Sequence, residues 1–302
     1  MTKKPEISII MNCHNGERFL EEALKSVLSQ SFKNWELIFW NNRSSDKSEK
    51  IFKSFKDKRF KYFYTHKKVS LYHSRNAACK KAKGKFIAFL DVDDLWFPNK
   101  LKLQLKKFKD KKVGLVYGKF YKVNNENFLK KKQLISKENL PTGYITKELL
   151  QSYPVGLLTI MLRRNFLKKE KDIFRVKYNY LGDLDFVLRF SLKHKFEAVQ
   201  EPIAQYRQHE NQMQRKYYKT KSIQFNNWYE EIIKLKTFGN KENLRLLEEW
   251  NRFHNTSTLI KTQKYKKAIK DILKYPFNKN KFKLLIMLFF PRIISKKLIS
   301  ET

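Results

Sequence analysis

The first 110 residues alternate between short apolar runs and longer amphipathic stretches, and this alternation restricts the fold more than any other feature. The apolar runs are typical of buried strands, because residues with high strand propensity lie between turn-forming residues. In the stretches between them, apolar residues recur every three or four positions, as on the buried face of a helix. Strands that alternate with helices need crossover connections, which predicts an α/β fold with a mostly parallel sheet flanked by helices. The predicted strands are EISIIMN (6–12), NWELIFW (34–40), RFKYFYT (59–65) and KFIAFLD (85–91).

The pattern changes along the rest of the chain. Pro98 is placed to open a further helix, and the runs at 113–123 and 133–136 predict antiparallel additions to the sheet. Past about residue 218 the sequence becomes helical and rich in lysine. We therefore predict a main domain over 1–218 and a basic helical segment over 219–302.

The formal net charge of +37 bears on the partners of the chain. Residues 1–210 carry 45 Lys and Arg against 22 acidic residues, and residues 211–302 carry 21 against 7. Of the 66 basic residues, 53 are Lys. A/T-rich codons explain this bias without any function. Selection for an anionic partner, such as a membrane surface, a nucleic acid or a phosphate-bearing substrate, explains it equally well.

The sequence also bears on the compartment. Cys13 and Cys79 give neither a disulfide framework nor a metal-binding spacing, which fits a reducing environment. The N-terminal run lacks the long apolar region of a signal peptide. The most apolar stretch, 284–294, is too short to cross a bilayer and contains Pro291 and Arg292. We expect a cytoplasmic protein without a transmembrane helix.

Polar residues follow three of the predicted strands. The carboxyl ends of parallel strands meet at one edge of a sheet, and ligands of such folds bind beyond that edge. Three loops are therefore predicted to converge on a single site. Their polar residues are Cys13, His14, Asn15, Asn41, Asn42, Asp91, Asp93 and Asp94.

The three aspartates of this set, in the run AFLDVDDLW (88–96), need an explanation in a basic protein. Neighbouring carboxylates repel each other and raise each other's pKa unless a cation lies among them. Mg²⁺ or Mn²⁺ suits such a place, because these ions take carboxylate oxygens and share their other positions with water and phosphates. A helix cap is the structural alternative, and we favour the metal because three aspartates follow one strand.

The segments 7–51 and 73–94 resemble the family 2 glycosyltransferases, which have the GT-A fold and use nucleotide-diphosphate sugars. The resemblance is nearly continuous over 6–110, and further motifs extend it to about residue 210. It implies a GT-A type, Rossmann-like, mostly parallel sheet. It also implies a nucleotide-sugar half over about 1–110 and an acceptor half over about 111–218.

The resemblance assigns donor-binding roles to the first two loops. Cys13, His14 and Asn15 match the loop that holds the nucleotide base, with His14 where a Tyr is common. Asn41 stands where an Asp usually contacts the base or ribose, and its amide keeps uracil recognition open. Arg75 matches an arginine near the nucleotide. Without the resemblance, these residues would be interpreted as a buried thiol, turn formers and a solvated helix charge.

The same resemblance places Asp91 at the ribose, Asp93 at the metal and Asp94 beside them. In YNYLGDLDFVLRFSLKH (178–194), Asp183 falls at the position of the catalytic base, although Gly182 replaces the usual Glu before it. Asp183 would accept the proton of the acceptor hydroxyl during an inverting displacement. Asp183 and Asp185 lie two residues apart on a helix, so only one can be the base; both could instead be favourable first-turn acids.

The run QYRQHENQ (205–212) resembles a segment that follows the base in many members. On a strand, Arg207 and His209 would face the same way. They could hold the diphosphate or complete the metal site; the alternative for His209 is an ordinary surface residue.

At the C-terminal end, apolar residues mix with Lys and Arg, as in segments that lie on a membrane surface. A helix that packs on the main domain is the alternative. Together these features predict a metal-dependent inverting glycosyltransferase of cell-surface glycan synthesis, peripheral on the inner face of the membrane. The expected donor is a UDP-sugar and the acceptor a glycan or lipid-linked glycan. The alternatives are a non-catalytic nucleotide-sugar-binding relative and a nucleic-acid-binding protein, and the sequence shows no nucleic-acid-binding motif that would favour the latter.

Overall fold

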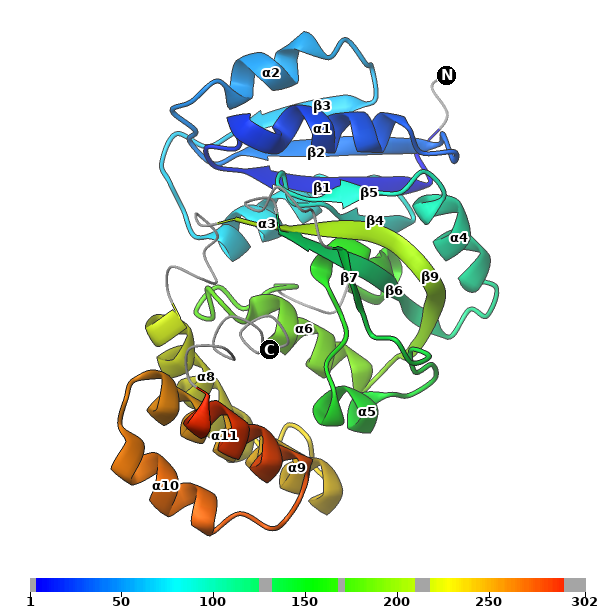
Figure 1. The fold of residues 1–302 in the computed structure, drawn as a ribbon. Coiled ribbons are helices and arrows are strands. Elements are labelled where there is room, and N and C mark those ends of the chain that lie inside the picture. The colour runs from blue at the N-terminus through cyan, green and yellow to red at the C-terminus, as the bar shows by residue number, and fades with distance from the viewer. Residues whose placement is uncertain (1–3, 125–131, 168–171, 210–217, 291–302) are drawn as a thin grey trace. The chain divides into compact units, whose positions relative to one another are not determined.

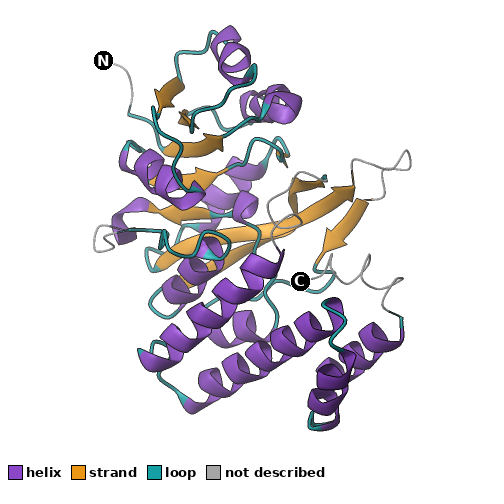
Figure 2. Cartoon of the chain, turned by 90° about the vertical axis from the view of Figure 1, so that its left-hand side faces the viewer, coloured by secondary structure: helices purple, strands orange, loops and turns teal. Residues whose placement is uncertain are grey.

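The computed structural model describes residues 4–124, 132–167, 172–209 and 218–290 (Figure 1). The chain divides into two compact units, Met1–Lys216 and Tyr217–Thr302. Among the described residues, all strands belong to the first unit, and the second consists of helices and short connections (Figure 2).

The N-terminal unit is built on a nine-stranded sheet. Its strands are β1 (Ile7–Cys13), β2 (Trp35–Asn41), β3 (Phe60–Tyr64), β4 (Phe86–Phe89), β5 (Leu95–Trp96), β6 (Val113–Asn124), β7 (Lys132–Ile135), β8 (Met161–Arg163) and β9 (Lys195–Gln208). Its helices are α1 (Glu17–Leu28), α2 (Ser48–Ser54), α3 (Leu71–Lys80), α4 (Lys100–Lys107), α5 (Thr146–Gln151) and α6 (Gly182–Ser191), with the short 3-10 helices η1 (Leu157–Thr159) and η2 (Arg164–Leu167).

The strands lie in the order β3, β2, β1, β4, β8, β6, β9, β5, and β7 pairs with β6. Strands β3, β2, β1 and β4 are parallel, as the alternation of strands and helices predicts. Strand β8 is antiparallel to both β4 and β6, whereas β6 and β9 are parallel. The sheet is therefore parallel in its first half and mixed in its second. The antiparallel pairing of β6 with β7 confirms the prediction for 113–123 and 133–136.

Strand β1 is buried on both faces because helices cover both sides of the sheet. Its alternate residues Ile7, Ile9, Met11 and Cys13 share a core with the buried side of α1. Helix α3 packs against β1 and β2, and its own buried residues lie outside that core, so it covers the opposite face. Full burial of a side chain such as Ile9 contributes roughly 1.5–3 kcal/mol to folding.

The register of the parallel strands sets where the site can form. Cys13 and Asn41, the last residues of β1 and β2, are paired with each other. On the other side of β1, Ile10 is paired with Phe89, the last residue of β4. The loops that follow these three strands therefore leave from one edge of the sheet, as predicted.

The C-terminal unit contains α8 (Tyr218–Lys234), α9 (Lys241–Lys261), α10 (Tyr265–Leu273) and α11 (Lys279–Phe289). Asn240 and Asn278 cap α9 and α11, because their side chains accept hydrogen bonds from the first turn of each helix. The core of the unit joins α9, α10 and α11 through Ile260, Ala268, Ile272, Tyr275, Leu284 and Met287. Within the described parts of the chain, each helix is too short or too polar to cross a bilayer.

Candidate active site

The loops that follow β1 and β2 lie against each other. The Asn42 N–H donates to the Cys13 carbonyl at 2.7 Å, and the Asn15 N–H donates to Ser44 Oγ at 3.0 Å. Asn15 has a φ of 56°, in the left-handed region that Asn tolerates better than most residues. Its Oδ1 accepts from the Ser45 N–H at 2.9 Å, which holds that conformation in place. The two loops thus form one connected surface.

Cys13 and His14 occupy this surface differently. Cys13 is buried, and burial raises the pKa of its thiol, so this cysteine packs as an apolar group. The ring of His14 is exposed, and its Nδ1 lies 2.9 Å from the Asn42 carbonyl. A carbonyl can only accept, so Nδ1 carries the proton when this hydrogen bond forms, and Nε2 is then left to accept one from a ligand.

The Asn41 side chain is hydrogen-bonded within the protein. It is fully buried: Nδ2 donates to the Tyr62 hydroxyl at 2.9 Å, and Oδ1 accepts from the Ser44 N–H at 2.8 Å. Asn41 therefore shapes the loop, and a direct contact with a nucleotide base would require both hydrogen bonds to be exchanged. Its role in base binding stays a prediction.

Arg75 and Asp91 form the best-defined ion pair of the edge. Arg75 Nη2 lies 2.6 Å from Asp91 Oδ1, and the guanidinium also lies over the ring of Tyr72 at 5.3 Å. Burial of Arg75 lowers its pKa, but the charges of Asp91 and Asp183 outweigh that effect and raise it. The Asp91 carboxylate is 36% exposed, so it remains accessible while it is held by Arg75.

Asp94 has a structural place behind the other two aspartates. Its carboxylate is buried and accepts from the Arg207 N–H at 3.1 Å. Burial raises its pKa well above the usual range, and the charges of Asp93 and Asp91 add to the rise. Asp94 thus ties the loop after β4 to the end of β9.

Asp93 and His209 come together from distant parts of the chain, with Asp93 Oδ2 and His209 Nε2 3.1 Å apart. The His209 ring lies 5.0 Å from the ring of Phe19, and its buried Nδ1 has no hydrogen-bond partner among the described residues. Arg207 also lies over Phe19, so the two side chains face the same way, as predicted for a strand.

Arg207 itself is already engaged. Its side chain is 2% exposed, and Nη1 lies 2.7 Å from Glu22 Oε2 of α1. This ion pair fixes β9 against α1. The pair with Glu22 involves one guanidinium nitrogen, Nη1, and the role of Arg207 at the diphosphate stays a prediction.

The residues that suit a divalent cation are Asp93 and His209. Asp93 Oδ2 and His209 Nε2 lie within hydrogen-bond distance of each other, and the unpaired Nδ1 shows that the ring is not satisfied by the described protein atoms alone. Within the described residues, however, no three His, Cys, Asp or Glu side chains are arranged to hold a metal. The pair fits an ion that takes few protein ligands and completes its shell with phosphate oxygens and water.

Asp183 opens α6, and its carboxylate is positioned by Tyr72 of α3. The Tyr72 hydroxyl donates to Asp183 Oδ1 at 2.9 Å and accepts from the Asp183 N–H at 3.2 Å. Tyr72 is buried, and its ring packs on Phe174 with centroids 5.2 Å apart. A rigid, buried side chain therefore fixes one carboxylate oxygen of Asp183.

Gly182 allows this arrangement. A Cβ at residue 182 would lie 2.7 Å from ring carbons of Tyr72, which is closer than real contacts allow. Only glycine leaves room for the Tyr72 ring at this distance. The Tyr72 ring thus occupies the space that the usual Glu side chain would need at residue 182.

Asp185 is separated from the site by its own partners. It is buried, with Arg189 Nε 2.9 Å and Arg175 Nη1 3.6 Å from its carboxylate oxygens. A buried carboxylate held by two guanidinium groups serves the packing of α6. Of the two aspartates on α6, Asp183 is the one whose carboxylate remains near the sheet edge.

Three buried or half-buried tyrosines lie near the carboxylates, and sequence patterns drew attention only to the third, within the run QYRQHENQ. They are Tyr72, Tyr153 and Tyr206. Burial raises the pKa of Tyr206, and the charges of Asp94, Asp93, Asp91 and Asp183 add to the rise, so all four carboxylates share one neighbourhood. The one signal for Tyr72 was its spacing of three from Arg75 on the same helix face.

A half-parallel, half-mixed sheet with its carboxylates at the carboxyl edge of the parallel half defines an α/β protein of the GT-A glycosyltransferase class. The pattern of "Glycosyl transferase family 2" matches residues 8–170. Because this match covers more than half of the sequence, the chain belongs to glycosyl transferase family 2.

Named relatives agree with this assignment. The chain is 33% identical over 174 residues to the Escherichia coli "UDP-Glc:alpha-D-GlcNAc-diphosphoundecaprenol beta-1,3-glucosyltransferase WfgD", which covers 58% of this chain and 66% of that protein. It is 28% identical over 163 residues to the "Putative teichuronic acid biosynthesis glycosyltransferase TuaG" of Bacillus subtilis, with 53% and 63% covered. The chain thus spans about two thirds of the length of these relatives.

Solved structures share the fold. The S. aureus TarS fragment 1–349 in complex with UDP-GlcNAc has a TM-score of 0.60 at 20% identity, and the match covers 76% of this chain and 66% of that chain. The mannosyltransferase PcManGT from Pyrobaculum calidifontis, in complex with GDP-Man and Mn²⁺, has a TM-score of 0.61 at 14% identity, with 99% and 85% covered. At these identities the likeness establishes the fold alone.

Proposed function

We propose that the chain transfers a sugar, with inversion, from a nucleotide-diphosphate donor to an acceptor hydroxyl. The observation that carries the proposal is the Asp183 carboxylate, held by Tyr72 in the same neighbourhood as the Arg75–Asp91 pair. A single displacement needs a fixed carboxylate beside the donor site, because this base must accept the proton of the acceptor hydroxyl while its oxygen attacks the donor sugar.

Asp183 would act as the general base. Tyr72 donates to Oδ1, which leaves Oδ2 directed to accept the proton of the acceptor hydroxyl. Asp185 has no part in this step, because its carboxylate is bound by Arg189 and Arg175. Tyr72 therefore acts as a positioning residue that orients the base.

Asp93 and His209 would hold a Mg²⁺ or Mn²⁺ ion together with oxygens of the diphosphate. Such an ion supplies positive charge that stabilises the diphosphate leaving group. Asp94 supports this part of the site by fixing the loop to β9. PcManGT, which shares the fold, has Mn²⁺ in its complex.

The donor would lie across the loops after β1, β2 and β4. His14 offers an exposed ring and a free acceptor to the base, with Cys13 and Asn15 shaping the loop around it. Asp91, accessible and fixed by Arg75, would accept a hydrogen bond from the ribose. A UDP-sugar is the donor we favour, because the names of WfgD and TarS carry UDP-Glc and UDP-GlcNAc.

The acceptor we propose is a glycan or lipid-linked glycan of the cell surface. The name of WfgD contains a diphosphoundecaprenol acceptor, and that of TuaG contains teichuronic acid. With such an acceptor, the protein would work in the cytoplasm at the inner face of the membrane. The proposed main domain, 1–218, and helical segment, 219–302, lie within two residues of the compact units Met1–Lys216 and Tyr217–Thr302.

The sharpest test is sugar transfer by Asp183→Asn, measured with labelled donor. Loss of a general base lowers kcat by roughly 10²–10⁴-fold, while donor affinity should stay unchanged. Asp110→Asn is the matched control, because Asp110 is an exposed aspartate paired with Lys195 and should keep full transfer. Full transfer by Asp183→Asn would overturn the assignment of the base.

The donor is identified separately by a thermal-shift screen of nucleotide-diphosphate sugars with and without Mn²⁺. We expect one donor to raise the melting temperature only when the metal is present, since ligand binding to the folded state stabilises it. Asp93→Ala should remove the metal-dependent part of the shift. A shift that persists in this variant would contradict the role of Asp93.

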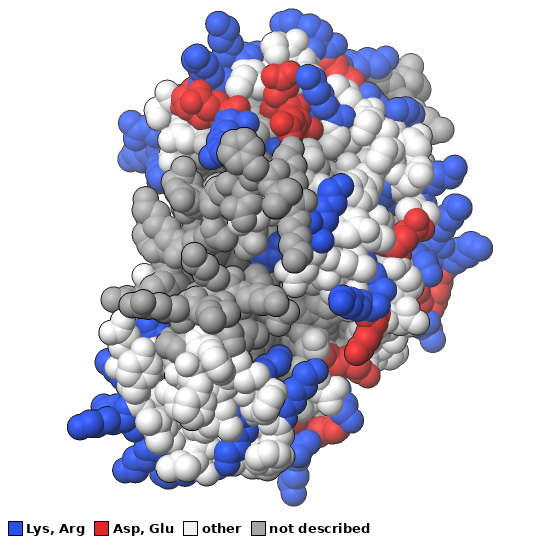
Figure 3. Space-filling model, viewed as in Figure 1, with Lys and Arg blue, Asp and Glu red and all other residues white. Residues whose placement is uncertain are grey.

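A non-catalytic nucleotide-sugar-binding protein is the second candidate, because Asn41 and Gly182 depart from the family pattern. This candidate predicts donor binding in the thermal-shift screen with neither transfer nor hydrolysis. A nucleic-acid-binding role is less well supported. On the face shown in Figure 3, Lys and Arg side chains are spread widely and do not gather in one patch.

A further inference from the structure

The helix α10 exposes an apolar stripe that the core of its own unit does not use. Ala268 and Ile272 face the core shared with α9 and α11. Tyr265, Ile269 and Leu273 are exposed, and they lie four residues apart, which places them on one side of the helix. Helix α10 is therefore apolar on two sides, and one of these sides is open.

Helix α11 and the loop before it repeat this feature. Leu284 and Met287 of α11 are buried in the shared core. Phe282 is 61% exposed and Phe289 is 72% exposed, and Phe277 in the loop between α10 and α11 is 92% exposed. Exposed phenylalanines gathered on one helical pair are unusual on a soluble surface and mark a binding region.

Positive charge accompanies these apolar side chains. Residues 263–290 contain eight Lys and one acidic residue, Asp271. Lys266 and Lys270 are exposed on α10, and Lys274 is exposed at its C-cap. Figure 3 shows uncharged surface bordered by Lys and Arg in this unit.

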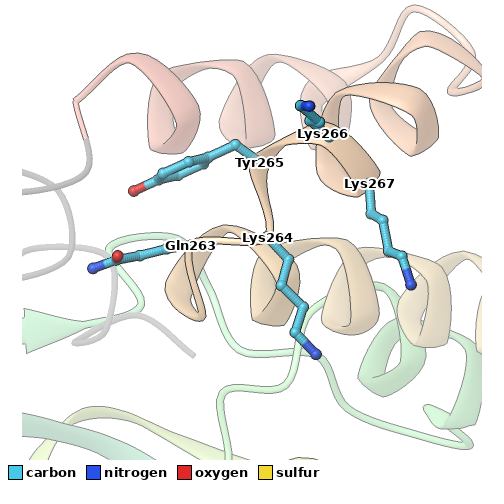
Figure 4. A pocket seen from close by; sticks show the side chains of 5 residues that line it. All are labelled: Gln263, Lys264, Tyr265, Lys266 and Lys267. Atoms are coloured by element: carbon cyan, nitrogen blue, oxygen red, sulfur yellow. The ribbon is translucent and has the colours of Figure 1, made fainter.

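A small pocket lies at the start of the same helix, at the turn between α9 and α10 (Figure 4). Three of its five lining residues are Lys264, Lys266 and Lys267, and the others are Gln263 and Tyr265. Figure 4 shows Lys264 and Lys267 extending to the same side of the turn. The three lysines therefore place positive charge beside this pocket, where it would attract an anionic headgroup.

We propose that α10, α11 and the loop between them bind an anionic lipid surface. The membrane-facing surface is defined by Ile269, Leu273, Phe277, Phe282 and Phe289, with the lysines of residues 263–290 around it. Its apolar side chains would enter the boundary between headgroups and acyl chains, and the lysines would meet the anionic headgroups.

The two kinds of side chain together select lipid among the anionic partners. A nucleic acid would account for the lysines, and its bases would stack on the phenylalanines, but the exposed aliphatic side chains of Ile269 and Leu273 would gain nothing from it. A neutral apolar protein surface would account for the phenylalanines but would leave the lysines unmatched. An anionic bilayer surface matches both.

This inference deepens the proposed function, since it rests on a membrane-linked acceptor for its purpose. Its test does not require transfer, because vesicle binding is measured without donor or acceptor. Failure of the lipid surface and failure of the proposed chemistry are therefore distinguishable.

The test is flotation of the full chain with vesicles of 30% phosphatidylglycerol in phosphatidylcholine, compared with phosphatidylcholine alone. We expect binding to the anionic vesicles that falls steeply as salt rises. The triple variant L273S/F277S/F282S should lose at least tenfold in partition coefficient. The side chains are exposed, so the variant should keep the circular dichroism spectrum of the parent.

Matched controls separate this surface from general properties of the chain. Tyr144→Ser removes an aromatic residue of the other unit that is 67% exposed, and it should bind as the parent does, unlike Phe277→Ser.

The lysines have their own matched pair of variants. K266Q/K270Q/K274Q should weaken binding at least tenfold at low salt. K106Q/K107Q/K109Q removes the same charge from exposed lysines of α4 and the turn after it, and it should bind nearly as the parent does.

Three results would overturn the proposal. The first is equal binding of L273S/F277S/F282S and the parent to anionic vesicles. The second is binding of double-stranded DNA that competes with the vesicles and is unaffected by the triple variant. The third is a parent chain that does not float and is a dimer, together with a triple variant that is a monomer. That result would assign the surface to a second copy of the chain.

Discussion

The two units arrange charged and apolar groups in opposite ways. In the N-terminal unit, charged side chains such as Arg75 and Asp94 are buried, and partners from other segments hold each of them. In the C-terminal unit, apolar side chains such as Leu273 and Phe277 are exposed. A buried charge needs partners in exact register, whereas an exposed apolar stripe needs only the period of a helix. The site of the first unit therefore depends on tertiary contacts, and the surface of the second depends on local structure.

The largest effect that tests this comparison is expected from the core of the C-terminal unit. Leu284→Ala removes a fully buried side chain and should lower the free energy of unfolding of that unit by about 2–5 kcal/mol. Leu273→Ala, on the neighbouring helix and 73% exposed, should change it by less than about 0.5 kcal/mol. Hydrogen exchange of peptides from 218–290 measures the change in unfolding free energy in each variant. Equal loss of protection in peptides of the N-terminal unit would show that the two units do not unfold separately.

A smaller effect is expected at the Gly182–Tyr72 contact of the N-terminal unit. Gly182→Ala places a Cβ against the Tyr72 ring and should cost about 1–3 kcal/mol of stability, since the buried ring has little room to move. Denaturant unfolding measures the cost. In a Tyr72→Ala background the same substitution should be nearly neutral, and an unchanged cost there would show that the ring is not the obstacle.

The smallest effect is expected from the hydroxyl of Tyr72. Tyr72→Phe removes both hydrogen bonds between the hydroxyl and Asp183. The bond that orients the carboxylate is worth roughly 1 kcal/mol, so its loss should lower kcat about five- to tenfold without changing the donor KM. Tyr62→Phe is the matched control: its hydroxyl bonds Asn41 in the donor loop, so this variant should raise the donor KM and leave kcat unchanged. A rise in donor KM for Tyr72→Phe would place Tyr72 in donor binding and not in orientation of the base.

Much of the fold was predictable because its signals are local. Apolar runs such as 7–13 and 35–41 are buried on both faces, and a strand buried on both faces within an alternating pattern leads to a parallel sheet. The carboxyl edge follows from that sheet. Strands β5 and β8 gave no signal, because two or three residues are too few to show a period.

Less of the candidate site was predictable. Sequence patterns drew attention to Asn41 and Arg207, but their side chains are bonded to Tyr62 and Glu22. Sequence patterns gave no reason to connect Tyr72 with Asp183, which lies 111 residues away along the chain. Such long-range pairs decide which polar atoms remain accessible. The periodicity of neighbouring residues does not predict these pairs.

The sequence by itself determined the α/β class, the edge where the loops meet and the basic, helical end of the chain, because strand and helix periods and charge are properties of neighbouring residues. Only the tertiary structure decided that Asp183 is held by Tyr72 and that Arg207 is paired with Glu22. It also decided that Gly182 makes room for a ring. The physical reason is that hydrogen bonds and ion pairs form over about 3 Å between atoms, whatever the separation of their residues in sequence.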